Sequence, residues 1–117
     1  MYPLKVIENT SLVKHLGGPP VFLDSFVKQI RLSHDAAELD IELSHQSNPL
    51  IDRNMLVRLV LHGVETFDLT KTRPTHDVMI LVDLDIKKTG DRFQLRFETI
   101  EGLTQSFHFR EFDMRPL

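Results

Sequence analysis

The spacing of apolar residues changes once along the chain, from a helical period near the beginning to strand-like alternation in the rest. Leu12, Val13 and Leu16 fall on one side of a helix. Residues 9–11 offer three N-cap candidates, and Gly17-Gly18-Pro19-Pro20 ends the segment, because glycine supplies the left-handed C-terminal residue and proline cannot continue the hydrogen-bond ladder. The pattern predicts one helix of about two turns.

From Phe26 onwards, apolar and polar residues alternate with a period of two, which is typical of strands buried on one face. The clearest run places Leu39, Ile41 and Leu43 on the face opposite Glu38, Asp40, Glu42 and Ser44. Further alternating runs begin at Phe26, Met55, Val64, Val78, Phe93 and Phe107, and are separated by turn-forming segments around 34–36, 46–49, 71–75, 88–91 and 101–102.

The fold class that follows is α+β but mainly β. We expect an antiparallel meander of about six to seven strands, arranged as a curved sheet or an open barrel, with one short N-terminal helix. Residues 1–117 are expected to form a single domain, because the chain has no repeat, linker or low-complexity tract.

Two of the runs assign particular residues to faces. In the first, Phe26, Ile30 and Leu32 share the inward face, with Lys28 as an exception to the pattern. In the second, Ile80, Val82, Leu84 and Ile86 share one face, whereas Leu81, Asp83 and Asp85 share the other.

Composition excludes several classes of protein. Of the 117 residues, 41% are hydrophobic and eight are phenylalanine, which excludes collagen-like and disordered chains. The absence of cysteine excludes disulfide frameworks and thiolate nucleophiles. No signal peptide and no run of about 18 apolar residues is present, so we expect a soluble, cytoplasmic protein that does not bind membranes. The formal charge of −3 argues against nucleic acid as a partner.

The residues that could carry chemistry do not form a recognised catalytic pattern. The six histidines lack metal-ligand spacing, and neither a Gly-x-Ser-x-Gly elbow nor a phosphate-binding glycine loop occurs. We therefore predict no catalytic residue, no metal and no cofactor.

Carboxylates are the best candidates for contact with a partner. Glu38, Asp40 and Glu42 alternate along one strand, and Asp83 and Asp85 share a face of another. One reading is a solvated sheet face that discourages edge-to-edge aggregation. The other is an acidic patch that binds a basic protein partner. The loop from Lys71 to Asp77 is an equally good candidate for a binding surface.

Several stretches of the chain are similar to one family. Pro19–Leu32, with the sequence PPVFLDSFVKQIRL, leads into Leu39–Leu43; Val57–Glu65 reads VRLVLHGVE; Phe93–Glu98 is followed by Gly102 and Phe107–Phe109. This pattern resembles the immunity protein 50 family, found beside polymorphic toxins in bacteria. The resemblance implies a small intracellular antidote that acts by binding a cognate toxin domain, without catalysis.

An alternative function stays open from the sequence. The chain could be a small ligand-binding or enzymatic β-barrel with a pocket beneath the N-terminal helix, where His62, His108 and Asp24 would converge. A fully packed interior would contradict it. The sequence also leaves homo-oligomer formation open.

Overall fold

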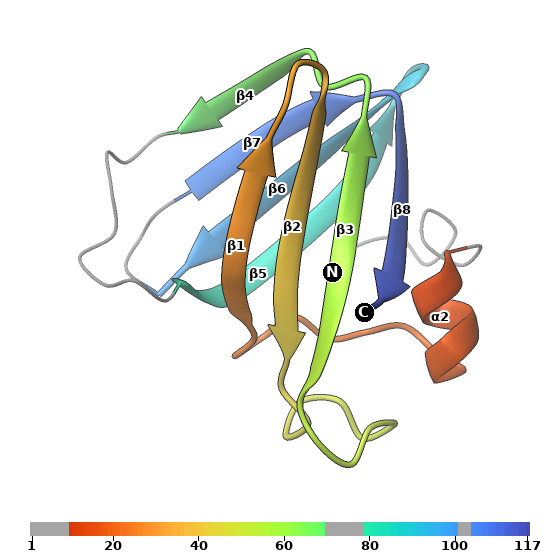
Figure 1. The fold of residues 1–117 in the computed structure, drawn as a ribbon. Helices are drawn as coiled ribbons and strands as arrows, with labels where there is room; N and C mark the ends of the chain where they lie inside the picture. The colour runs from red at the N-terminus through yellow and green to blue at the C-terminus, as the bar shows by residue number, and fades with distance from the viewer. Residues whose placement is uncertain (1–9, 70–78, 101–103) are drawn as a thin grey trace.

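The computed structural model describes residues 10–69, 79–100 and 104–117, which form one short helix and eight strands (Figure 1). In chain order these are α2 (Ser11–Leu16), β1 (Phe26–Leu32), β2 (Ala36–Leu43), β3 (Met55–His62), β4 (Thr66–Leu69), β5 (Met79–Thr89), β6 (Arg92–Thr99), β7 (Thr104–Phe109) and β8 (Glu111–Pro116). The predicted fold class, mainly antiparallel sheet with one short helix, is confirmed. The sheet has one strand more than predicted, because the run that forms β8 was not recognised in the sequence.

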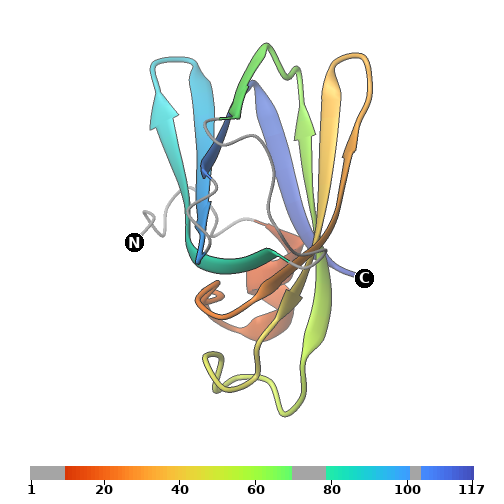
Figure 2. The same cartoon turned by 90° about the vertical axis from the view of Figure 1, so that its left-hand side faces the viewer.

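The strands form two layers that face each other (Figure 2). The sheet order is β4-β7-β6-β5-β1-β2-β3-β8, and every pairing is antiparallel. We call β1-β2-β3-β8 the first layer and β4-β7-β6-β5 the second layer. Among the described residues, two pairs, Phe26 with Ile80 and Val27 with Met79, join β1 to β5 at the seam between the layers. The sheet is not closed, since β4 and β8 lie at its two ends.

At the end opposite the seam, two short connections carry the chain between layers. Residues 63–65 join β3 to β4, and Arg110 alone joins β7 to β8. Backbone hydrogen bonds hold the connections together: Arg110 N–H donates to the His62 carbonyl at 3.0 Å, and Glu65 N–H donates to the His108 carbonyl at 2.9 Å. The predicted meander is thus two meanders, β1-β2-β3 and β5-β6-β7, joined by these crossings.

A β-bulge in β1 changes the face on which Phe26 lies. The register shifts between Val27 and Gln29, so Lys28 is an extra residue that has no partner of its own in β2. Val27 points inward and is 1% exposed, whereas Phe26 is only half-buried and lies on the outer face. The prediction that Phe26 shares the inward face was wrong, and Lys28, the exception in the pattern, marks the bulge.

A second bulge, in β5, lies beside the same seam. The register against β6 shifts between Leu81 and Asp83, which leaves Val82 as the extra residue. Leu81 is fully buried and Val82 is 42% exposed, the reverse of the predicted faces. Leu84 and Ile86 are buried as predicted.

The core lies between the layers and is one cluster of buried side chains. Leu39, Ile41 and Leu59 enter it from the first layer, and Phe97 and Phe107 enter it from the second; none is more than 1% exposed. At the crossing end, Phe93, Phe109 and Phe112 pack as an aromatic cluster with ring centroids 5.3 to 5.9 Å apart. A common core of this kind holds the two layers to each other.

Helix α2 forms as the sequence predicts and packs against β8. The Thr10 hydroxyl accepts a hydrogen bond from Val13 N–H, and Gly17 ends the helix in the left-handed region at φ 79°. Leu12 is fully buried in the core, while Val13 and Leu16 pack at its margin. Within the described ranges, no helix has the length and apolar character needed to cross a membrane.

Candidate interaction surfaces

The outer face of the first layer carries four charged side chains that contact one another, here called the arginine–carboxylate cluster: Arg31, Glu38, Asp40 and Arg58. Their strands are β1, β2 and β3, and the antiparallel register places Arg31 opposite Glu38 and Asp40 opposite Arg58. The cluster is therefore a direct product of strand register, in which opposite charges meet across neighbouring strands.

Asp40 is the centre of this cluster. Arg58 donates from Nε to Oδ1 at 2.8 Å and from Nη2 to Oδ2 at 3.2 Å. Arg31 donates from Nη1 to Oδ2 at 3.0 Å and from Nη2 to Oδ1 at 3.3 Å, and its Nε reaches Glu38 at 2.9 Å. Two guanidinium groups thus bind one carboxylate, and each guanidinium donates two hydrogen bonds. This geometry fixes both arginine side chains.

The electrostatics of the cluster favour the charged forms of all its central groups. The hydrogen bonds from Arg58 and then Arg31 lower the pKa of Asp40 below its usual range, although partial burial opposes this shift. In return, hydrogen bonding to Asp40 raises the pKa of both Arg31 and Arg58. The side chain of Asp40 is only 11% exposed, so its negative charge is covered by the two arginines.

The third carboxylate of the predicted acidic strand is also engaged within the protein. Glu42 lies 3.7 Å from Lys28 Nζ and accepts a hydrogen bond from Asn54 Nδ2 at 3.1 Å. Glu38, Asp40 and Glu42 do share the outer face of β2, as their alternation predicts. Each has a donor on the same face, however, so the strand does not present three uncompensated charges to a partner.

Asp83 and Asp85 lie elsewhere, on the outer face of the second layer. Asp83 is exposed opposite Glu98 of β6, and Asp85 lies opposite Arg96. Within the described part of the chain, neither aspartate forms an ion pair. The structure therefore does not bring the five predicted carboxylates together, since three face outward on one layer and two on the other.

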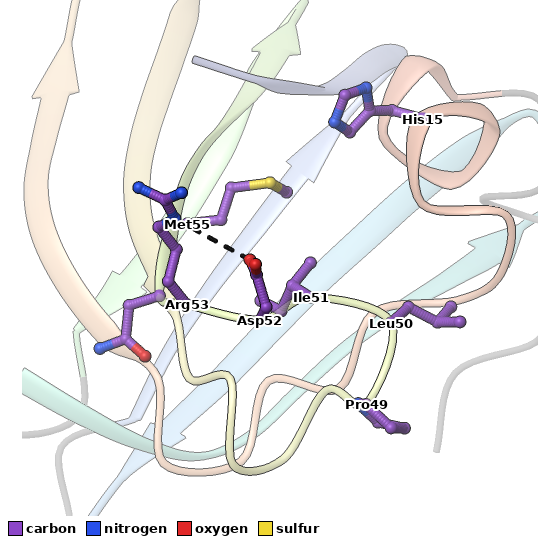
Figure 3. Close-up of a pocket in the computed structure, with 8 residues that line it drawn as sticks. His15, Pro49, Leu50, Ile51, Asp52, Arg53 and Met55 are labelled. Atoms are coloured by element: carbon purple, nitrogen blue, oxygen red, sulfur yellow. Dashed lines mark ion pairs between the residues drawn. The ribbon is translucent and has the colours of Figure 1, made fainter.

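An open hollow of about 500 Å³ lies between α2 and the loop that joins β2 to β3 (Figure 3). His15 points from the helix toward Met55, while Pro49 and Leu50 lie on an earlier part of the loop, away from Met55. An ion pair of 3.8 Å joins Arg53 to Asp52, but both side chains are almost fully exposed, at 87% and 93%. Water screens such a pair, so it contributes little to a binding site.

The three polar residues predicted to converge beneath the helix line no common site. Asp24 precedes β1 at the seam, where its N–H donates to the Leu81 carbonyl at 3.0 Å. His62 ends β3, opposite Ala36, which begins β2 at the other end of the first layer. A strand the length of β1 spans roughly 20 Å, so these two residues lie far apart. His108 belongs to β7, in the second layer.

The predicted binding loop from Lys71 to Asp77 lies outside the described residues. Among the residues that the structure describes, no three or more His, Asp or Glu side chains are grouped so that they could hold a metal ion.

Arg31 and Arg58 are the residues that the sequence-based reading missed. Both stand at outward positions of their runs, so alternation alone places them on the same side as Glu38 and Asp40. What alternation cannot supply is the register between strands, and without it the cationic partners of an acidic strand cannot be assigned.

Comparison with known proteins identifies the fold but no family. No family model matches the chain, and no curated protein matches it. Among solved structures, the chain is similar to the crystal structure of an uncharacterized protein from Neisseria gonorrhoeae, with a TM-score of 0.59 over 83% of this chain and 95% of that one. The sequence identity is 9%, so the similarity is one of fold alone.

Proposed function

We propose that this chain is a non-enzymatic binding protein of the immunity type, which occupies a toxin domain encoded beside it and blocks that domain. The observation that carries the proposal is the separation of apolar and charged side chains in the two-layer sheet. Apolar side chains from both layers fill one common core, and the charged residues singled out by the sequence lie on outer faces. A partner of a molecule built in this way would contact these outer faces.

The arginine–carboxylate cluster adds to this support. Arg31 and Arg58 are 35% and 26% exposed, and their contacts with Asp40 hold them in place before any partner arrives. Side chains that are already ordered lose less conformational entropy on binding, and arginine is among the residues that most often dominate interface energy. The resemblance to the immunity protein 50 family points in the same direction.

Among the features that favour the ligand-binding alternative is the hollow beside α2. Its charged pair is exposed to water, and it is lined by other residues than Asp24, His62 and His108. Surface recognition of a protein is therefore the better supported proposal.

Co-expression with the products of the adjacent genes tests the proposal. We expect one of them to be toxic alone, to be tolerated when this chain is present, and to co-purify with it in a stoichiometric complex. A matched control is a core variant, Phe97→Asp, which should lose protection together with folding. If no adjacent gene product binds the purified chain at micromolar concentration, the immunity proposal is rejected.

A further inference from the structure

Another open hollow, of about 340 Å³, lies at the seam beside the beginning of β1 and the end of β2, which are the lower ends of these strands in Figure 1. We call it the seam hollow. Its lining includes Asp24, Phe26, His45, Gln46 and Ile80. It therefore brings a carboxylate, an imidazole and an amide together with two apolar side chains, a combination typical of a small binding site.

Asp24 supplies the seam hollow with a charge that nothing described neutralises. Its φ of 64° lies in the left-handed region, and its N–H donates to the Leu81 carbonyl at 3.0 Å, which anchors this turn to β5. The carboxylate is exposed and forms no hydrogen bond or ion pair with any residue that the structure describes. Asparagine accepts positive φ as aspartate does, so the backbone conformation alone does not require a charge here.

The hydrogen bonds of Asn54 fix the tautomer of His45. Asn54 Oδ1 accepts from the backbone N–H of His45 at 3.0 Å, and Asn54 Nδ2 donates to the Glu42 carboxylate at 3.1 Å. The amide orientation is thus set by one group that only donates and one that only accepts. Since Nδ1 of His45 lies 2.7 Å from the same Oδ1, it must carry the ring proton. In the neutral ring, Nε2 is then left as an acceptor.

The groups at the seam hollow favour a ligand that is cationic and donates several hydrogen bonds. Asp24 offers a carboxylate, His45 offers Nε2, and Gln46 offers an amide oxygen, whereas Phe26 and Ile80 are half-buried and offer apolar surface. The neighbouring cation does not cancel this preference. Lys28 Nζ lies 5.7 Å from the centre of the Phe26 ring but is only 3.7 Å from Glu42, which compensates its charge.

We infer that the seam hollow binds the guanidinium group of an arginine side chain. A guanidinium is planar, stays charged and carries five donors in fixed directions, so one group can bond to separate acceptors while its flat face packs on an aromatic ring. An ammonium donates from a single point and has no flat face. The inference rests on the proposed function for the source of the arginine, which is a toxin domain, and it deepens that function by naming the chemistry of one contact.

A small arginine compound tests the chemistry without any partner protein. N-acetyl-arginine amide is compared with the equivalent lysine and citrulline compounds, of which citrulline keeps nearly the shape of arginine but has no charge. We expect the arginine compound to shift the backbone NMR signals of residues 24–26 and 44–46 in a saturable way. Absence of these shifts, or equal shifts with lysine or citrulline, would overturn the inference.

Matched variants locate the binding site. Asp24→Asn tolerates the positive φ but removes the charge, and His45→Asn keeps a donor for Asn54 Oδ1 but removes Nε2. Each should weaken binding of the arginine compound about fivefold or more, because a hydrogen bond to a charged group is lost. Asp83→Asn and His62→Asn are the controls, since both side chains are exposed away from the seam hollow. Unchanged binding in Asp24→Asn and His45→Asn would refute the site.

The adjacent gene product separates this inference from the proposed function. If it binds the wild type, Asp24→Asn should weaken the complex and Asp83→Asn should not. Equal binding by the wild type and both variants would overturn the inference and leave the proposed function standing. If no adjacent gene product binds but the arginine compound does, the immunity proposal is rejected and the guanidinium chemistry of the seam hollow is supported.

Discussion

At the scale of single residues, Asp40 is a charged group that stabilises the outer face of the first layer although its side chain is almost inaccessible to solvent. Two arginines supply four hydrogen bonds to its carboxylate, and the side chain keeps little contact with water. A lone charge at this exposure would be costly, so the group depends on its partners. Asp40 therefore contributes to the stability of the first layer.

Replacing Asp40 with asparagine should lower the free energy of unfolding by about 1 to 2 kcal/mol. The amide cannot accept paired hydrogen bonds from two guanidinium groups, so some of the arginine donors lose their partner. Chemical denaturation monitored by circular dichroism measures the change. Asp83→Asn is the matched control and should stay within about 0.5 kcal/mol of the wild type, since Asp83 is exposed and faces another carboxylate.

The stability of the wild type should also depend on pH through the same carboxylate. The pKa of Asp40 is lower in the folded state than its ordinary value of 3.8, so its contribution is complete above that value and is lost as the pH falls through the folded pKa. The stability difference between wild type and Asp40→Asn should be constant from about pH 5 to 8 and should shrink in more acidic solution. A difference that grows in acid would contradict this account.

At the scale of elements, the turns and connections carry conformations that only some residues accept. Gly63 and Gly90 have almost the same positive φ, 66° and 67°, but different surroundings. A Cβ at Gly90 would meet nothing within 4 Å, whereas at Gly63 it would lie 3.0 Å from Cγ of Arg110 and 3.1 Å from its Cβ. The crossing from β3 to β4 is thus packed against the crossing from β7 to β8.

Substituting alanine at these two glycines should separate backbone strain from packing. Gly90→Ala should cost about 1 kcal/mol of folding free energy, because an L residue is strained at positive φ. Gly63→Ala carries the same strain and also displaces Arg110, so it should cost about 1 kcal/mol more. Thermal and denaturant unfolding of both variants measure the difference, and equal losses would show that the crossing accommodates the methyl group.

The elements also show where sequence reasoning succeeds. Alternation identifies β2 with its inward residues and locates β3 and β6, because these segments follow one period without interruption. The same pattern locates helix α2, the glycine that ends it and three N-cap candidates, of which Thr10 is the cap. It misassigns faces in β1 and β5, since one extra residue in each strand shifts the period. It misses β8, which follows β7 after the single residue Arg110 and so lacks the turn that marks a hairpin.

The candidate site was predictable only in part for a related reason. That Glu38, Asp40 and Glu42 share a face follows from alternation alone. That Arg31 and Arg58 cover Asp40, and that Phe26 lies beside Ile80 on the outer face, depends on register and on the bulge at Lys28. Register is set by contacts between strands, which a single-strand pattern does not contain.

At the scale of the whole molecule, the two layers are expected to unfold together. They share one core, and the seam between β1 and β5 is too short to hold them by backbone pairing alone. Phe97→Ala, in the second layer, should cost about 3 to 5 kcal/mol and should lower hydrogen-exchange protection in β2 and β3 as well as in β6. Leu23→Ala, at a side chain 47% exposed, is the control, with less than about 0.5 kcal/mol. Loss of protection confined to the second layer would mean that the layers unfold independently.

The two bulges beside the seam are positions at which the chain should tolerate deletion of a single residue. Deleting one residue from a strand normally moves every later side chain to the opposite face of the sheet. Removing Lys28 would instead leave Val27 and Ile30 inward on either side of Gln29, and removing Val82 would leave Leu81 and Leu84 inward on either side of Asp83. Each strand would be straighter but would keep its buried and exposed faces. These are two places in the sheet where loss of a single codon is expected to spare the core.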